Sequence, residues 1–305
     1  MSECELLPWN QDKFDKLSEL EASQQLGHAY LIQGQKGLGK ERLAKDFSAY
    51  LFCQKPEKLT ACGDCPACHL FSAGTHPDFK YIALEESSSQ IKIDQVRDSR
   101  TFLANTPLMG KYKILLVYSA EKMNINAANA LLKNLEEPAP GTLLFLLSHQ
   151  PGLLLPTIRS RCQQIKIPRP NEDIALRWLK KYISEEQAKA CLELTFGAPL
   201  QALNYANEER QQERREIQKS LLELLRSELL ITDAAKFLSA YQIDDVLEHL
   251  MLSLQQIIRN LHSHNAEIEI ELSSEELRNI INILTAEAIK SLHEFHSELI
   301  HARRL

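Results

Sequence analysis

The stretch that decides the fold is Gly34-Gln35-Lys36-Gly37-Leu38-Gly39-Lys40, which is followed by Glu41. It matches a phosphate-binding loop, in which glycines let backbone N–H groups surround phosphate oxygens and the lysine neutralises their charge. A short apolar strand is expected before it, over residues 28–32, and a helix after it, over residues 40–52. Strand, loop and helix in this order predict the core of an α/β domain. The candidate nucleotide contacts in the loop are Gly34, Gly37, Gly39 and Lys40.

The loop lacks the partners that would let it hold a metal ion. Position 41 carries a carboxylate where a working loop has a Ser or Thr hydroxyl for Mg²⁺. The next buried strand should end in an acidic pair that orients the ion and the attacking water, but Tyr118 and Ser119 stand there. We interpret the nearby Glu121 as a surface carboxylate at the start of a helix. The sequence therefore predicts that the chain does not hydrolyse ATP, and leaves open whether the loop still binds nucleotide.

Four cysteines form the strongest chemical signal in the chain. Cys62, Cys65 and Cys68 make two consecutive Cys-x-x-Cys steps, and Cys53 stands at the end of the preceding helix. Four thiolates suit one tetrahedral ion, for which zinc is the default. A redox dithiol would need only one pair, and an iron–sulfur cluster usually spreads its ligands differently. We therefore expect residues 53–68 to hold a structural zinc ion with no open position for chemistry.

Composition indicates a folded protein of two or three domains. The chain has 305 residues, of which 44% are hydrophobic and 25% charged, and its formal net charge is -6. This charge argues against nucleic acid wrapping the whole surface, and a local basic face stays open. No run of about 18 apolar residues occurs, and the first residues are acidic rather than signal-like. We expect a cytoplasmic protein without a membrane span.

The order of the expected elements divides the chain into three parts. Residues 1–167 alternate near-continuous apolar strands with helices, as in a parallel sheet covered on both faces. Residues 168–207 open with two prolines and continue as short helices, and residues 208–305 have the amphipathic pattern of a helical bundle. We interpret the charged stretch 207–216 as a linker turning into an exposed helix face. Further strands are expected at 114–118, 143–147 and 163–167, and further helices at 94–103, 126–136, 173–183, 185–196, 199–206, 217–230, 234–241, 244–261 and 273–292.

Several motifs resemble those of bacterial clamp-loader subunits of the AAA+ family, in the same order and spacing. Besides the loop at 34–40 and the four-cysteine insert, the motifs are Gly74-Thr75-His76-Pro77-Asp78, Asn129-Ala130-Leu131-Leu132-Lys133-Asn134-Leu135-Glu136-Glu137-Pro138 and Thr157-Ile158-Arg159-Ser160-Arg161-Cys162. The resemblance implies an AAA+ core, a helical lid at 168–207 and an α-helical collar at 208–305 that joins a hetero-pentamer.

The resemblance also implies a role for one arginine. In that family the Ser-Arg-Cys arginine touches the γ-phosphate of ATP held by the adjacent subunit, which points to Arg161. The alternative role for any lone arginine is a surface ion pair. In a looser alignment with the family, Arg159 would take the place of Arg161. The implied partners are gamma/tau-type and delta-type subunits, the sliding clamp, and primed DNA reached through the complex. Lys111 and Lys133 face that DNA or clamp, or are simply solvated.

The departures from the active pattern favour a particular kind of subunit. Besides the changes at the phosphate loop, Leu200 stands where active relatives carry a phosphate-sensing arginine. We expect a non-hydrolysing subunit that completes a neighbour's ATP site and helps load the clamp onto primed DNA. One alternative, an ATP-hydrolysing subunit of gamma/tau type, needs the missing hydroxyl and acidic pair. The other alternative is a zinc-dependent nucleic-acid-binding protein. It would need a basic surface around the cysteines, but the acidic residues Glu57 and Asp64 flank them.

Overall fold

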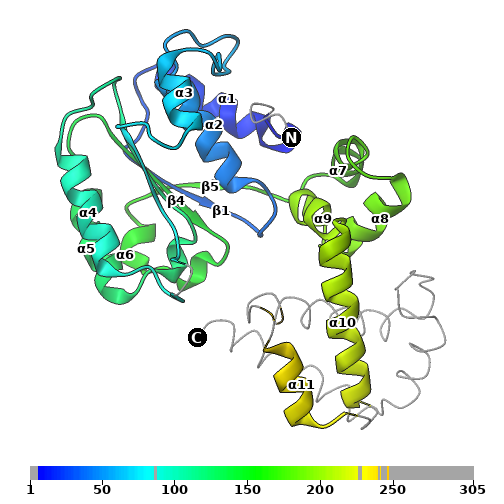
Figure 1. The fold of residues 1–305 in the computed structure, drawn as a ribbon. Coiled ribbons are helices and arrows are strands. Elements are labelled where there is room, and N and C mark those ends of the chain that lie inside the picture. Colours follow the sequence, from blue (N-terminus) through cyan, green and yellow to red (C-terminus); the bar gives the residue numbers. More distant parts are fainter. Residues whose placement is uncertain (1–5, 86–87, 226–228, 240, 242–245, 247–305) are drawn as a thin grey trace. The chain divides into compact units, whose positions relative to one another are not determined.

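The computed structural model describes residues 6–85, 88–225, 229–239, 241 and 246, and the chain divides into two compact units, Met1–Ile174 and Ala175–Leu305. The first unit is built on a sheet of five parallel strands in the order β2-β3-β4-β1-β5 (Figure 1). The expected α/β core is therefore confirmed. The strands are β1 Ala29–Gln33, β2 Phe79–Ile82, β3 Lys113–Val117, β4 Thr142–Ser148 and β5 Gln163–Lys166.

The three inner strands of the sheet are buried along their whole length, which explains their near-continuous apolar sequences. In their register Leu31 pairs with Leu146, and Leu146 pairs with Val117 on the other side. The carboxyl ends of β1, β3 and β4 therefore meet at one edge of the sheet. The outer strand β2 was not predicted, because it is short and three of its four residues are only partly buried or exposed.

Helices cover both faces of this sheet. Figure 1 shows α1, α2 and α3 on one side and α4, α5 and α6 on the other. These helices are α1 Gln11–Ala22, α2 Lys40–Phe52, α3 Pro66–Ser72, α4 Ile93–Ala104, α5 Ile125–Glu136 and α6 Pro156–Arg159. Three short 3-10 helices are η1 Pro8–Asn10, η2 Ala120–Lys122 and η3 Pro151–Leu153.

The two sides of the core differ in chemistry. Toward α1 and α2 it is aromatic, with ring centroids 5.6 Å apart for Phe14 and Phe47 and 6.2 Å apart for Phe47 and Phe145. Toward α4 and α5 it is aliphatic and includes fully buried Leu115 and Leu131. Burial of these side chains supplies the main favourable term for folding.

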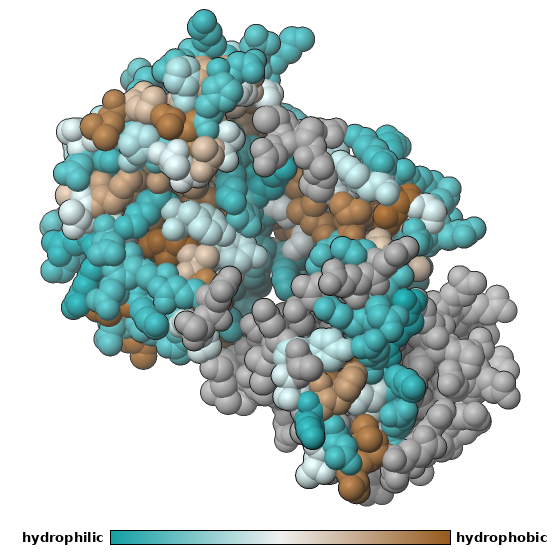
Figure 2. Space-filling model, in the orientation of Figure 1, coloured by the Kyte–Doolittle hydropathy of each residue, from teal (hydrophilic) through white to brown (hydrophobic). Residues whose placement is uncertain are grey.

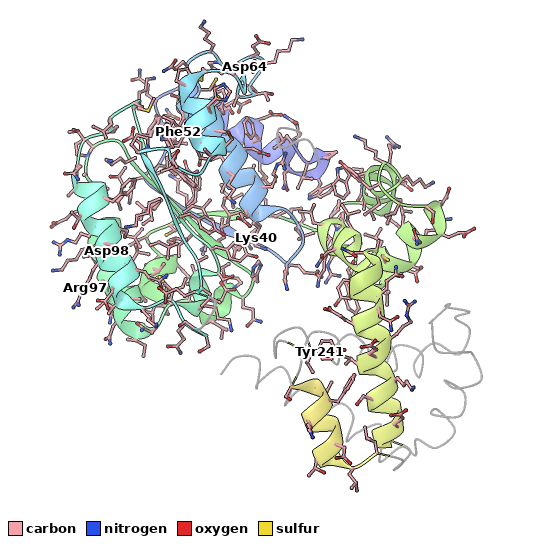
Figure 3. The ribbon with its side chains drawn as sticks, viewed as in Figure 1. Lys40, Phe52, Asp64, Arg97, Asp98 and Tyr241 are labelled. Atoms are coloured by element: carbon pink, nitrogen blue, oxygen red, sulfur yellow. The ribbon has the colours of Figure 1, made fainter. Side chains whose placement is uncertain are left out.

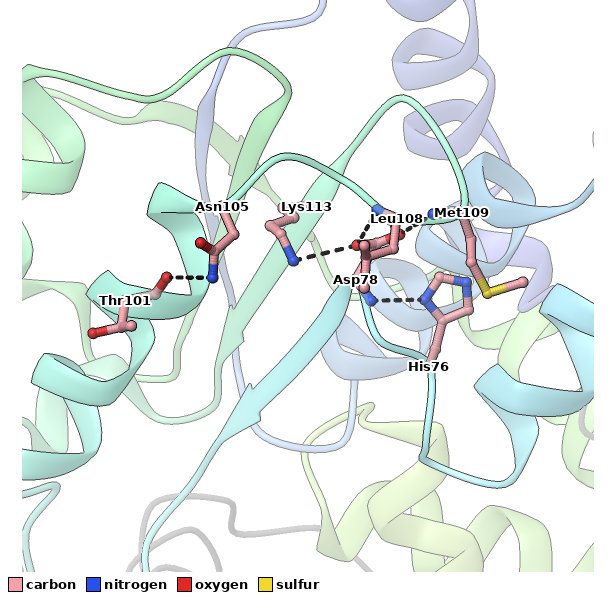
Figure 4. A network of polar contacts seen from close by, with 7 residues as sticks. All are labelled: His76, Asp78, Thr101, Asn105, Leu108, Met109 and Lys113. Atoms are coloured by element: carbon pink, nitrogen blue, oxygen red, sulfur yellow. Dashed lines mark hydrogen bonds and ion pairs between the residues drawn. The ribbon is translucent and has the colours of Figure 1, made fainter.

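A buried polar network lies in the connection that follows the four-cysteine insert (Figure 4). The Asp78 carboxylate is fully buried and accepts hydrogen bonds from the backbone amides of Leu108 at 2.8 Å and Met109 at 2.7 Å. It also lies 3.2 Å from Nζ of Lys113, a lysine that is itself only 4% exposed. Removing either member of such a pair would leave the other as a buried, unpaired charge, which is strongly destabilising.

His76 links this network to the helix that carries the first cysteine. Its Nδ1 accepts a hydrogen bond from the Asp78 amide at 3.2 Å, and its ring stacks on Phe52 with centroids 3.9 Å apart. Phe52 is the last residue of α2, directly before Cys53. The motif at residues 74–78 thus holds the loop between α4 and β3 to the base of the cysteine insert.

Helices also follow β5. They are α7 Glu172–Leu179, α8 Glu185–Leu194, α9 Pro199–Tyr205, α10 Glu208–Leu225 and α11 Ile231–Leu238. The three short helices predicted between 173 and 206 are confirmed, each with an earlier C-terminal end, and the helix predicted at 234–241 runs from Ile231 to Leu238. The helices predicted at 244–261 and 273–292 lie outside the described residues except for Val246.

The stretch predicted at 207–216 as a linker turning into an exposed helix face is a helix, and only the linker part of that prediction is wrong. Helix α10 runs from Glu208 to Leu225 and includes the first part of the segment predicted at 217–230. Polar residues one helical turn apart support each other there: Gln212 donates to Glu216 at 2.7 Å and accepts from Arg215 at 3.3 Å. Tyr241, labelled in Figure 3, donates its hydroxyl to the same Glu216.

Hydrophilic residues cover most of the visible face of the first unit, with small apolar areas between them (Figure 2). Such scattered apolar residues are normal on a protein surface. None of the helices among the described residues combines the length and apolar character that crossing a bilayer requires.

Candidate functional site

The phosphate loop keeps the backbone shape of its type. It joins β1 to α2, and Gly37 and Gly39 have φ values of 80° and 79°, which glycine adopts without strain. Gly34 is packed so closely that a Cβ there would lie 2.6 Å from the carbonyl oxygen of Ile167. The glycines predicted as contacts therefore have local structural reasons to be glycine.

Lys40 is directed at the loop itself. Its Nζ donates to the carbonyl oxygens of Gly34 and Gln35, each at 2.7 Å. The residue is only 3% exposed, and this burial lowers the pKa of Lys40 to about 8, partly opposed by the charge of Glu121. Figure 3 shows Lys40 at the loop end of α2. The lysine thus stabilises the loop by bonding two of its carbonyl groups.

The N-terminal segment holds the same loop from outside. Trp9 Nε1 donates to the Leu38 carbonyl oxygen at 2.9 Å, and Asn10 Nδ2 lies 3.2 Å from that oxygen and 3.3 Å from the Gly39 oxygen. Sequence reasoning missed both residues, because nothing in a Pro-Trp-Asn stretch indicates contact with a loop 29 positions away. The loop is therefore fixed by side chains of its own chain.

Glu41 is held by neighbours and forms part of a new network. Its carboxylate accepts from the Tyr81 hydroxyl at 3.0 Å and pairs with Lys45 Nζ at 2.6 Å. The Tyr81 ring stacks on Tyr118 with centroids 6.5 Å apart, and Tyr118 meets His149 edge-on at 5.6 Å. Burial, with Glu41 beside it, raises the pKa of Tyr81, so the hydroxyl stays a donor. The substitutions at 41 and 118 are therefore joined through Tyr81 on β2.

Glu121 is not the surface carboxylate that we predicted from the sequence. It lies in η2 behind β3, where its Oε1 accepts the backbone N–H of His149 at 3.1 Å. Its Oε2 is buried and has no hydrogen-bond partner among the described residues, as is also true of Ser148 Oγ. The sequence around Glu121 did not indicate this contact, because only the parallel pairing of β3 and β4 brings Glu121 and His149 together.

The four predicted cysteines form one cluster. Their Sγ atoms all lie within 4.8 Å of one another, and none of the six cysteines among the described residues forms a disulfide. Four thiolates about 2.3 Å from a tetrahedral zinc ion would stand ~3.8 Å apart, so a small contraction would bring them into place. Sulfur ligands in this number suit zinc or another soft ion. The cluster is therefore able to hold a metal ion.

The pKa values of the clustered thiols differ from one cysteine to another. Burial opposes charge on Cys65, but hydrogen bonds from the backbone amides of Gln54 and Cys68 outweigh it and lower the pKa of the Cys65 thiol to about 6. Burial and the nearby Cys65 raise the pKa of Cys68. A cation would favour the thiolate form of all four residues, because metal ligation and deprotonation are coupled.

Arg161 lies on the surface between α6 and β5. Its side chain is 37% exposed, whereas the following Cys162 is buried. The guanidinium Nη2 is 2.7 Å from Oε1 of Glu136, and Nη1 donates to the carbonyl oxygen of Thr157 at 3.0 Å. The arginine is thus exposed and also oriented by its own chain.

The other candidates occupy separate places in the fold. Arg159 donates to the Pro151 carbonyl oxygen at 3.5 Å, and Lys133 is exposed on α5. Lys111 is also exposed, with Nζ 3.5 Å from Glu21. Leu200 lies in α9. The role of the two lysines stays a prediction.

A phosphate loop between β1 and α2, on a parallel sheet of order β2-β3-β4-β1-β5, defines an AAA+-like core. A family model described as DNA polymerase III, delta subunit matches residues 9–171. The chain is similar to the DNA polymerase III subunit delta' of Pseudomonas aeruginosa, with 41% identity over 76% of this chain and 71% of that protein. It is 31% identical to the subunit delta' of Yersinia pestis over 97% of this chain and 88% of that protein.

A solved structure of a DNA polymerase III gamma subunit-related protein from Thermotoga maritima aligns with a TM-score of 0.46 and 20% identity, covering 91% of this chain and 81% of that chain. The sequence matches are stronger and extend over most of the chain. The chain therefore belongs to the delta' subunits of the DNA polymerase III clamp loader. This assignment confirms the family resemblance noted in the sequence.

Proposed function

We propose that this chain is the non-hydrolysing member of its complex and completes the ATP site of an adjacent subunit with Arg161. The proposal rests on the contrast between the chain's own phosphate loop and the surface that carries Arg161. The chain's own phosphate loop has Glu41 bound to Tyr81 and Lys45, while the Arg161 guanidinium is exposed on a different surface. An arginine suits this role because its planar, permanent charge contacts phosphate oxygens as charge develops on them.

The loop cannot hold a catalytic metal ion in the usual way. Glu41 replaces the hydroxyl ligand, and the acidic pair is replaced by Tyr118 and Ser119. The remaining acid, Glu121, is bonded to a backbone amide through one oxygen. Without a bound Mg²⁺ and an activated water, phosphoryl transfer loses its main electrostatic support.

The isolated chain is expected to show no ATP turnover above contaminant background, because both the metal ligands and the water-activating pair are missing. Steady-state phosphate release by the purified protein measures this directly. Glu41→Thr alone should not create an ATPase, since the acidic pair would still be absent. Turnover that follows the protein through purification and disappears in Lys40→Ala would instead support the gamma/tau-type alternative.

We propose that Cys53, Cys62, Cys65 and Cys68 hold one structural zinc ion. The four sulfur atoms are gathered at the base of the insert, directly after Phe52 and beside the His76 network. A closed four-thiolate site leaves no position for a reacting water, so its effect is to fix the insert on the core.

Metal analysis of protein purified without added zinc should find about one zinc ion per chain, the ratio that a single four-thiolate site implies. Cys65→Ser should lower this ratio sharply. Cys191→Ser is the matched control, because Cys191 is also a buried cysteine that forms no disulfide but lies outside the cluster. Iron in place of zinc, or equal zinc loss in both variants, would contradict the assignment.

We further propose that residues 168–207 act as a lid and residues 208–305 as a collar that joins a hetero-pentamer with gamma/tau-type and delta-type subunits. In that complex the chain would help open the sliding clamp and load it onto primed DNA in the cytoplasm. Reconstitution with and without this chain tests the proposal. Loading of a labelled clamp onto primed DNA should require it, and full loading by the remaining subunits would contradict the proposed role.

A further inference from the structure

We infer that Glu136 is a positioning residue for Arg161, and this inference rests on the role proposed for Arg161 above. Glu136 is the last residue of α5, and Arg161 follows α6, so the pair joins two helices that pack on the same face of the sheet (Figure 1). Within the described part of the chain, the ion pair recorded for the Glu136 side chain is the one with Arg161. Its expected effect on catalysis therefore passes through the arginine.

The contacts fix the guanidinium on two sides. Nη2 lies 2.7 Å from Glu136 Oε1, and Nη1 donates to the Thr157 carbonyl oxygen at 3.0 Å. A guanidinium has five N–H donors. These two contacts use two of them, so within the described part of the chain three donors remain for an incoming phosphate. The carboxylate can therefore orient the arginine while N–H donors remain for a phosphate.

A carboxylate at position 136 destabilises helix α5 when the helix is considered by itself. Glu136 stands at the C-terminal end of α5, where the helix dipole disfavours negative charge, and Glu137 adds a second carboxylate next to it. Arg161 offsets this charge. If the role of the pair were purely structural, it would be to stabilise the end of the helix. However, ion pairs as exposed as this one usually contribute little to folding stability. Here the side chains of Arg161 and Glu136 are 37% and 46% exposed.

Restricting the long, flexible arginine side chain is expected to benefit catalysis. A free arginine samples many rotamers, and it must lose them when it engages a phosphate on another subunit. The Glu136 and Thr157 contacts remove part of this freedom before the neighbour binds. A group held near its working geometry contributes more to the rate than one that must be ordered during the reaction.

The test uses a double-mutant cycle in the reconstituted clamp loader, with Glu136→Ala, Arg161→Ala, the double variant and Glu137→Ala as a matched control. Hydrolysis is measured in complexes in which only the adjacent ATPase subunit keeps its phosphate-loop lysine, so that other sites do not dilute the effect. Glu136→Ala should lower kcat about 2- to 5-fold, the range that an exposed ion pair supports, with the KM for ATP unchanged. Glu137→Ala should leave both constants as in the wild type.

Two further comparisons separate positioning from a structural role. In the Arg161→Ala background, Glu136→Ala should have no additional effect, because the residue acts only through the arginine. Glu136→Gln keeps an acceptor oxygen and should give a kcat between those of the wild type and Glu136→Ala. All variants should assemble into the complex equally and unfold at similar temperatures.

The outcomes are distinguishable. If Arg161→Ala lowers kcat but Glu136→Ala leaves it unchanged or raises it, the positioning role is wrong and the proposed function stands. A Glu136→Ala effect that persists without Arg161, or that comes from lost assembly, also overturns the inference. If Arg161→Ala itself has no effect on kcat, the proposed function fails.

Discussion

Arg161→Ala is expected to slow ATP hydrolysis at the adjacent subunit's site by on the order of 10³-fold, the scale of arginine fingers in other NTPases. The guanidinium would otherwise neutralise charge that develops on the phosphate in the transition state, and alanine removes this without affecting substrate binding elsewhere. Bulk hydrolysis and clamp loading should show only a partial defect if the complex has further active sites. Single-site complexes reveal the full effect.

The variant should fold and assemble normally, because the Arg161 side chain is exposed and its ion pair with Glu136 is a surface contact. Arg159→Ala is the matched control, since Arg159 is the neighbouring arginine and its guanidinium bonds the Pro151 carbonyl oxygen. A larger loss in Arg159→Ala would transfer the role to that residue. Abolished assembly, or unchanged hydrolysis and loading in Arg161→Ala, would show that the arginine is an interface or surface residue only.

Asp78→Ala is expected to lower the free energy of unfolding by about 3–5 kcal/mol, because it leaves Lys113 as an unpaired buried charge. It also removes the acceptor for the Leu108 and Met109 amides. Domains are stable by only about 5–15 kcal/mol, so the core would be close to unfolding. Urea denaturation followed by circular dichroism measures the change.

Asp98→Ala provides the control for this prediction. Asp98 is an exposed carboxylate on α4 (Figure 3), and its removal should change the free energy of unfolding by no more than about 0.5 kcal/mol. A double variant, Asp78→Ala with Lys113→Met, should recover part of the loss, because no buried charge is then left without a partner. Equal stability of Asp78→Ala and the wild type would contradict the importance of this network.

The same aspartate predicts a dependence on pH. Burial acts to raise its pKa, but the Leu108 and Met109 amides and Lys113 outweigh burial and hold the pKa of Asp78 below its ordinary value near 3.8. Its contribution to stability is therefore present above pH 3.8 and is lost as the pH falls through the folded-state pKa. The stability difference between the wild type and Asp78→Asn should shrink in that acid range and stay constant near neutral pH.

The elements predicted with most success were those whose own sequence carried a strong pattern. The apolar runs that form β1, β3 and β4 were located within one or two residues of their ends, because buried parallel strands need apolar side chains on both faces. The helices α1, α3 and α6 and the outer strand β2 were not predicted. Their patterns are weaker, since each is partly exposed and takes its place only by packing on neighbours.

The candidate site was predictable as a set of residues but not as a geometry. Cysteine spacing alone indicated the four-cysteine cluster, since residues close in sequence need little help from the fold to meet. The missing hydroxyl and acidic pair were also visible in the sequence. The Trp9 and Asn10 contacts with the loop were not, and neither was the contact of Glu121 with His149.

The sequence by itself thus predicted the α/β class of the core, the four clustered cysteines, the residues missing from the phosphate loop and the candidate arginine. Each of these depends on residue type and short spacing. Only the tertiary structure decided that Tyr81 joins Glu41 to Tyr118, that Asp78 and Lys113 form a buried pair, and that Glu136 holds Arg161. These contacts link residues from different strands and helices, and strand order and helix packing, rather than spacing along the chain, bring such residues together.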